Sequence, residues 1–235
     1  MDLAVPPPAP PSTTIDDAIA RMRSIDAALP PGDGVACFNR MYLEVTVGVG
    51  QLVQQNTIAD PAWVTKLDVV FANLYFAAVD SLSGPSSSQP TAWRPLLDAR
   101  GNRDIEPIQF ALAGMNVHIN HDLPLAVVKT CAELNSAPTD GKHHDDYQAV
   151  DKLLDASEQS VRESFEPADL QSADRHVAAV TNLVCNWSIN EARDVAWDTA
   201  LALWAVRDHD FATKLLTGSL ARLVAMGTQA LLVAV

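Results

Sequence analysis

Apolar residues recur at every third or fourth position through nearly all of this chain, and that spacing limits what it can fold into. Segment 14–29 is typical, because Ile15, Ala18, Met22 and Ile25 fall on one face of an α-helix. No segment alternates apolar and polar residues over its length, and no Asn-Gly turn marks a β-hairpin. The sequence therefore predicts an all-α fold, a single-domain bundle of about seven or eight helices.

Capping residues and prolines set the expected helix boundaries. We expect helices over 14–29, 35–55, 61–82, 107–134, 145–165, 167–184, 187–207 and 211–233, and a short turn over 93–99. The proline-rich segment 1–12 precedes them as an extended arm, so the expected domain spans residues 13–235. Pro124 cannot donate a backbone N–H, so the helix over 107–134 should kink beside it.

The charge and the cysteines exclude several classes of function. The 235 residues carry 16 Lys and Arg against 29 Asp and Glu, a net charge of -13. Such a chain is not expected to bind nucleic acid or an anionic membrane surface. The last 16 residues are apolar but short for a membrane span, so we expect them to form a buried helix. Three separated cysteines without a CxxC pair favour reduced thiols and a cytoplasmic location.

Three titratable residues lie close together in the most apolar helix. His118, His121 and Asp122 share one face of the segment 107–134, while Asn116 and Asn120 lie on the opposite face. Burying such side chains is costly unless hydrogen bonds or a ligand compensate. We therefore predict that His118, His121 and Asp122 are catalytic and face a cavity.

The same residues allow a metal site as an alternative. His118 and Asp122, four positions apart, could share one divalent ion such as zinc. In the segment 142–147, His144 could complete that site and Tyr147 could donate a proton. The structural alternatives are a hydrogen-bonded His–Asp pair without metal, and a helix cap followed by solvated charges.

A substrate pocket is expected where aromatic and polar residues share helix faces. Asn182, Asn186, Asn190, Arg193 and Trp197 form one stripe, similar to the metal triad of class I terpene synthases but without its Ser or Thr and its Glu. We expect an interior polar seam here, with Arg193 paired to Glu44 or Asp80. The predicted pocket residues are Arg40, Glu44, Phe71, Tyr75, Phe76, Met115, Asn186, Asn190 and Trp197.

Three segments carry a resemblance to known proteins. The segments 38–42, 71–76 and 113–124 together resemble an uncharacterised, chiefly actinobacterial family of unknown function. His118 and Asp122 also look like one helical element of zinc-dependent phospholipase C and its single-strand nuclease relatives. That resemblance implies at most one metal in a reduced site, because the second His-x-x-x-Glu element is absent here.

These features suggest an enzyme that acts on a small, largely apolar molecule inside the bundle. The chemistry would be of hydrolase, lyase or cyclase type, by His/Asp acid–base or metal-assisted catalysis. A non-catalytic carrier with the same pocket, or a structural helical domain that binds a partner, would explain the same pattern. The composition, the motifs and the resemblances leave the oligomeric state open.

Overall fold

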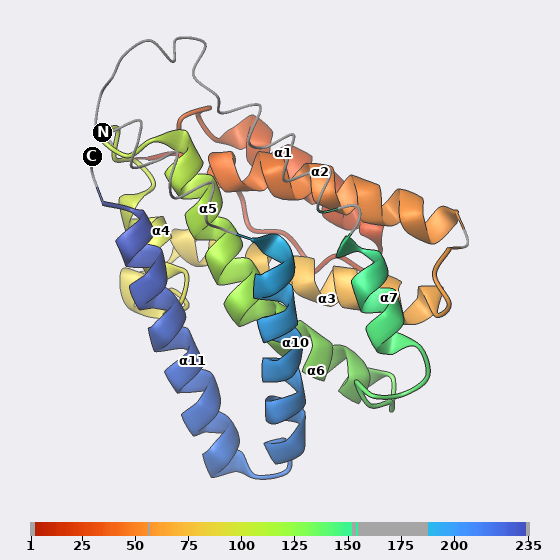
Figure 1. Ribbon diagram of the computed structural model, residues 1–235. Coiled ribbons are helices and arrows are strands. Elements are labelled where there is room, and N and C mark those ends of the chain that lie inside the picture. The colour runs from red at the N-terminus through yellow and green to blue at the C-terminus, as the bar shows by residue number, and fades with distance from the viewer. Residues whose placement is uncertain (1–2, 56, 152–153, 155–187, 234–235) are drawn as a thin grey trace.

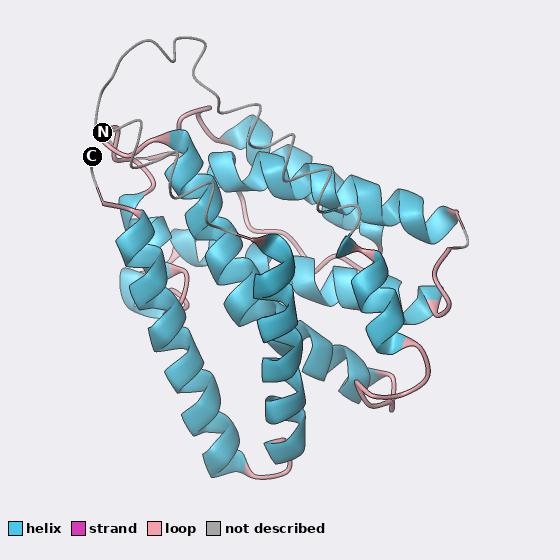
Figure 2. Ribbon diagram, in the orientation of Figure 1, coloured by secondary structure: helices cyan, strands magenta, loops and turns pink. Residues whose placement is uncertain are grey.

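The computed structural model describes residues 3–55, 57–151, 154 and 188–233. Every regular element in these ranges is helical, as Figure 2 shows, so the predicted all-α class is confirmed. The helix expected over 167–184, and most of the one expected over 145–165, lie outside the described residues.

The helix boundaries follow from local capping. In chain order the elements are α1 (Ile15–Ala28), α2 (Gly34–Gln54), α3 (Pro61–Asp80), the 3-10 turns η1 (Ser81–Ser83) and η2 (Ser86–Ser88), α4 (Arg94–Ala99), α5 (Pro107–Val117), the π-helix η3 (His118–Asp122), α6 (Leu123–Glu133), α7 (His143–Ala149), α10 (Ile189–Val206) and α11 (Asp210–Leu231). Thr14 and Asp17 form a capping box at α1, and Asp60 caps α3 through the backbone N–H of Trp63. The start of α7 differs from the expected helix start at Asp145, because Lys142 is the N-cap and Asp145 lies inside the first turn.

The line α5–η3–α6 lies at the centre of the bundle (Figure 1). α2 packs between α1 and α5, while α3 packs against α6. α10 contacts η3 and α6, and α11 runs beside α5. Polar and apolar side chains of residues 107–133 therefore contact several helices at once.

A π-helical turn lies at the position where a kink was expected beside Pro124. The backbone N–H of Leu123 bonds to the carbonyl oxygen of His118, five residues earlier, which is the π-helical pattern. Pro124 lies in the first turn of α6, where its missing N–H costs no helical hydrogen bond. The turn therefore accommodates the proline, and it places three titratable side chains where the helix geometry changes.

The N-terminal arm lies along the bundle. Asn73 on α3 accepts the backbone N–H of Ser12 at 2.8 Å and donates to its carbonyl at 2.9 Å. Arg21 donates to the carbonyl of Ala9 and also pairs with Asp80 at 2.5 Å. Asp80 therefore does not pair with Arg193, contrary to the expected polar seam.

The last helix is more exposed than the sequence predicts. In α11, Phe211 is 80%, Leu223 66% and Met226 67% exposed, so the expectation of a buried last helix is wrong. α3 is the one helix among those described that is long and apolar enough to cross a membrane, by length and composition only. It contributes buried residues to the core, as core helices of this composition do.

Gly114 sets the close approach of α5 to α2. A Cβ atom at Gly114 would lie 2.4 Å from the ring of Phe38, which is itself buried. We expect Gly114→Ala to lower the free energy of unfolding by about 1–3 kcal/mol, because the packed core cannot yield. In Gly218→Ala on α11, the added Cβ atom would lie no nearer than 3.7 Å to another atom. This substitution should raise the free energy of unfolding by about 0.5–1 kcal/mol. Urea unfolding of both variants checks this, and equal midpoints would contradict it.

Candidate functional site

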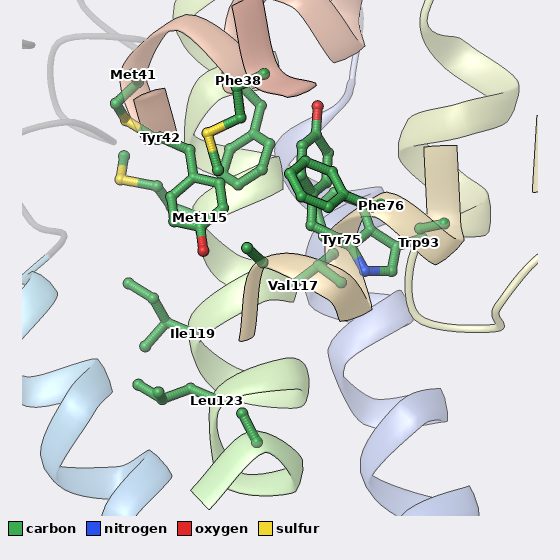
Figure 3. Packing of buried hydrophobic residues seen from close by; sticks show 14 of the residues in the cluster. Phe38, Met41, Tyr42, Tyr75, Phe76, Trp93, Met115, Val117, Ile119 and Leu123 are labelled. Atoms are coloured by element: carbon green, nitrogen blue, oxygen red, sulfur yellow. The ribbon is translucent and has the colours of Figure 1, made fainter. Parts of the chain in front are cut away.

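A cavity of about 90 Å³ lies between α2, α3, η3, α7 and α10. Its wall is almost entirely apolar and includes Phe38, Met41, Val49, Leu67, Phe71 and Ile119. Figure 3 shows several of these side chains from close by. Few polar residues interrupt this wall, so each of them needs a physical account.

His118 enters the cavity wall from the π-turn. Its ring stacks on Phe71, with centroids 3.5 Å apart and planes 4° from parallel. On one side of the ring, Nδ1 lies 3.0 Å from a carboxylate oxygen of Asp122. On the other side, Nε2 is buried and has no hydrogen-bond partner among the described residues. The imidazole is thus held in one orientation, with Nδ1 engaged by Asp122 and Nε2 without a partner among the described residues.

Asp122 is the centre of a hydrogen-bond cluster behind His118. It accepts from the indole Nε1 of Trp93 at 2.9 Å and lies 2.7 Å from Nδ1 of His121. Burial would raise the pKa of Asp122, but the hydrogen bonds from His118 and His121 outweigh it and leave that pKa lowered. An ionised carboxylate can only accept hydrogen bonds, so Nδ1 of His118 carries its proton and Nε2 carries a lone pair.

Burial also decides the charge of His118. It lowers the pKa of the imidazole, against the opposing effect of Asp122. The ring is therefore neutral at pH 7, with a lone pair on Nε2. A neutral imidazole held by a carboxylate through its other nitrogen is the arrangement that a general base requires.

Asp68 on α3 is a second buried polar group in the wall, which the sequence analysis did not single out. The residue is only 8% exposed, and its Oδ2 atom is buried with no partner among the described residues. Burial raises the pKa of Asp68 to about 7. Near neutral pH this carboxyl group therefore exchanges between its acid and its anion.

Tyr42 on α2 supplies the third such group, also missed from the sequence. Its hydroxyl is buried without a partner among the described residues, and its ring lies 4.4 Å from that of His118. In Figure 3 the hydroxyl points away from Phe38 and toward the side of Ile119. Burial, reinforced by the charge of Asp68, raises the pKa of Tyr42 well above its usual value. The phenol therefore keeps its proton and can donate it in a hydrogen bond.

The polar groups on α7 and α10 have partners already. The hydroxyl of Tyr147 donates to the backbone carbonyl of Arg193 at 2.7 Å, and burial raises the pKa of this phenol. The Arg193 guanidinium lies over the Tyr147 ring and pairs with Asp151 at 2.6 Å. Asp146 accepts two backbone N–H groups at the start of α3. The expected proton donor Tyr147 thus lines the cavity with its hydroxyl engaged, and Arg193 pairs with neither Glu44 nor Asp80.

The structure brings the expected metal ligands His118 and Asp122 together, but it does not add His144 to them. His144 is exposed and packs its ring against Trp197, with centroids 4.7 Å apart. Its neighbour His143 is buried, stacks on Trp63 and has Nδ1 2.9 Å from the carbonyl oxygen of Ala137. In the described part of the chain, no group of three or more His, Cys, Asp or Glu residues has the arrangement of a metal site.

The predicted pocket residues divide into three groups. Phe71 and Met115 line the cavity, as do the predicted catalytic residues His118 and Tyr147. His121, Asp122, Tyr75, Phe76, Asn190 and Trp197 lie outside its lining, and Asn186 lies outside the described residues. Arg40 and Glu44 are wrong as pocket residues.

Arg40 and Glu44 lie on the outer side of α2. Arg40 is partly exposed, pairs with Asp26 at 3.5 Å and donates to the carbonyl of Pro31, while Glu44 is exposed. Tyr42, between them in the sequence, shares the buried face with Phe38, Val45 and Val49 at helical spacing. That spacing is the signal that could have identified Tyr42. For Asp68, the signal was one carboxyl group between Leu67 and Val69 in an apolar helix.

Comparison with known proteins gives one match. A model of a family of unknown function (DUF5995) matches residues 15–234, which confirms the predicted resemblance to such a family. No curated protein matches the chain, and no solved structure matches it.

Proposed function

We propose a function for this chain on the premise that it belongs to the DUF5995 family, whose function is unknown. The chain is an enzyme that transfers a proton on a small, largely apolar molecule held in the cavity between α2, α3, η3, α7 and α10. The size and the apolar wall of the cavity support the choice of ligand.

One observation carries the proposal, namely that Nε2 of His118 has no hydrogen-bond partner among the residues that the structure describes. A buried nitrogen without a hydrogen bond costs free energy, so its presence in a wall that is almost entirely apolar favours a functional role. The Asp122 carboxylate binds Nδ1 of His118 and is itself held by hydrogen bonds from Trp93 and His121. His118 is therefore the catalytic base, and Asp122, His121 and Trp93 are positioning residues.

The roles of the groups follow from their charges. Nε2 of His118 takes a proton from the bound molecule, or from a water molecule beside it, and becomes an imidazolium. The Asp122 carboxylate stabilises that cation through Nδ1. The protonated hydroxyl of Tyr42 donates a hydrogen bond to the oxygen on which negative charge develops. Abstraction from carbon gives lyase or cyclase chemistry, and abstraction from water gives hydrolysis.

The metal-assisted alternative receives less support from the donor atoms. Both oxygens of Asp122 face histidine nitrogens that donate to them, and His144 is exposed and packs against Trp197. The proposal is therefore the acid–base form, with no step assigned to a metal.

Incubation with a metabolite extract tests the proposal. The purified chain should deplete one mass in an extract of the organism that encodes it and produce another, when followed by untargeted mass spectrometry. Heat-denatured protein is the control. Retention of a compound by the protein without conversion would contradict the enzymatic proposal and support a carrier. No retention and no conversion would favour a structural helical domain.

A further inference from the structure

Asp68 is the one acidic residue of the described cavity wall that has neither a cation nor a hydrogen-bond donor beside it. Asp146 accepts from the backbone N–H groups of Ala59 and Asp60, at 2.8 and 2.6 Å. The guanidinium of Arg193 is paired with Asp151. The proton-transfer scheme above gives Asp68 no part, so its burial is unexplained by that scheme.

We propose that Asp68 is the anchor for the ammonium group of a small lipophilic amine, whose apolar part fills the cavity. This inference rests on the proposed function, because it names the class of ligand that the same cavity takes. An ammonium group supplies both the charge and the hydrogen-bond donors that a buried carboxylate lacks.

The surroundings of Asp68 suit a cation with an apolar body. Trp63, Phe71 and Tyr42 present aromatic side chains to the same cavity, and aromatic faces attract alkylammonium groups. The chain carries a net charge of -13, which draws cations rather than anions toward its surface. The cavity of about 90 Å³ is smaller than engineered cavities of about 150 Å³ that admit benzene, so it fits a short alkyl chain.

The charge state of the site predicts how binding depends on pH. An alkylammonium group keeps its charge below pH 9, since its pKa is about 10. Asp68 must be ionised to pair with it, and burial raises the pKa of Asp68 to about 7. Amine affinity should therefore fall as the pH decreases from 8 to 5, approaching about tenfold per pH unit well below 7.

The other titratable groups on the cavity wall do not reverse the expected loss of amine affinity at low pH. Tyr42 on α2 and Tyr147 on α7 stay neutral, because burial raises the pKa of both phenols. Arg193 on α10 is paired with Asp151, and Asp146 is held by backbone donors. Burial lowers the pKa of His118 on η3, and any protonation of it at acid pH would repel the amine further.

Two probes of equal size test the inference. We would titrate the full chain with n-butylammonium chloride and with 2-butanone, following the indole N–H resonance of Trp63 by NMR. The ammonium probe should bind more weakly in Asp68→Asn by about ten- to a hundredfold, the loss of one charged hydrogen bond. Asp98→Asn, on an exposed part of α4, is the matched control and should bind like the wild-type chain.

The outcomes separate this inference from the proposed function. Amine binding that depends on Asp68, without any turnover in an extract, supports the ligand class and overturns only the proton transfer. Amine affinity that is unchanged in Asp68→Asn, or that rises as the pH falls, overturns the ligand class. Preferential binding of 2-butanone at acid pH would show that Asp68 acts as a neutral donor and would also overturn it. If Asp68→Asn does not fold, the pH dependence of amine affinity in the wild-type chain alone tests the ligand class.

Discussion

Asp122→Asn is expected to lower turnover by about 10²–10⁴-fold, the range that general acid–base catalysis supplies. The substituted amide keeps the shape of the side chain and one oxygen to accept from Nδ1 of His118. It no longer carries the negative charge that stabilises the imidazolium formed during proton transfer. The rate should therefore fall while the cavity and the stacking of His118 on Phe71 remain.

The measurement is the initial rate of the conversion found in the extract, for the wild-type chain and for two variants. Asp98→Asn removes an equal charge from an exposed position on α4 and should leave the rate unchanged. Circular dichroism of Asp122→Asn must show a folded helical protein. A folded Asp122→Asn variant with wild-type turnover would remove Asp122 from the mechanism.

Arg100→Met is expected to lower the free energy of unfolding by about 3–5 kcal/mol, the usual cost of leaving one member of a buried ion pair alone. Arg100 is 2% exposed, and its Nε donates to a carboxylate oxygen of Asp33 at 2.8 Å. The other Asp33 oxygen accepts the backbone N–H of Val35 as the cap of α2. Arg100 also donates to the carbonyl of Ala4, so the same side chain joins the N-terminal arm to the bundle.

A surface pair provides the matched control. Lys142 lies 2.8 Å from Asp145, but both side chains are largely exposed. Lys142→Met should therefore leave the free energy of unfolding close to that of the wild-type chain. Chemical denaturation of both variants makes the comparison. Similar costs for Arg100→Met and Lys142→Met would show that the buried pair contributes no more than a surface pair.

Helix limits were predictable here because capping is local. Thr14 with Asp17, and Asp60 with Pro61, each specify a helix start within a few residues of sequence. The described α2 also runs through Val45–Gly50, although valines and glycines there are poor helix formers. Packing against α1 and α5 outweighs that propensity.

The face of a helix was harder to predict than its ends. Arg40 and Glu44 were expected in the pocket because they are polar residues four positions apart on one helix face. They lie on the exposed side of α2, and Tyr42 between them lines the cavity. Without the partner helices, the buried face of a largely apolar helix is poorly defined by its own sequence.

The cluster at the π-turn was predictable in part. The spacing of His118 and Asp122 correctly indicated that the two side chains interact. Two further contacts of the cluster come from segments distant in the chain. The indole N–H of Trp93, just before α4, donates to Asp122, and the ring of Phe71 stacks on His118. Such contacts depend on the tertiary arrangement of the helices, which the spacing of residues along one helix does not reveal.

The protonation state of His118 tests the central claim most directly. With ¹⁵N-labelled histidine, the two ring nitrogens of His118 can be identified by comparison with a His118→Gln variant. We expect a neutral ring at pH 7, with the proton on Nδ1 and a lone pair on Nε2, because Asp122 holds Nδ1 and burial lowers the pKa of His118. A doubly protonated ring at pH 7, or a proton on Nε2, would contradict its assignment as the catalytic base.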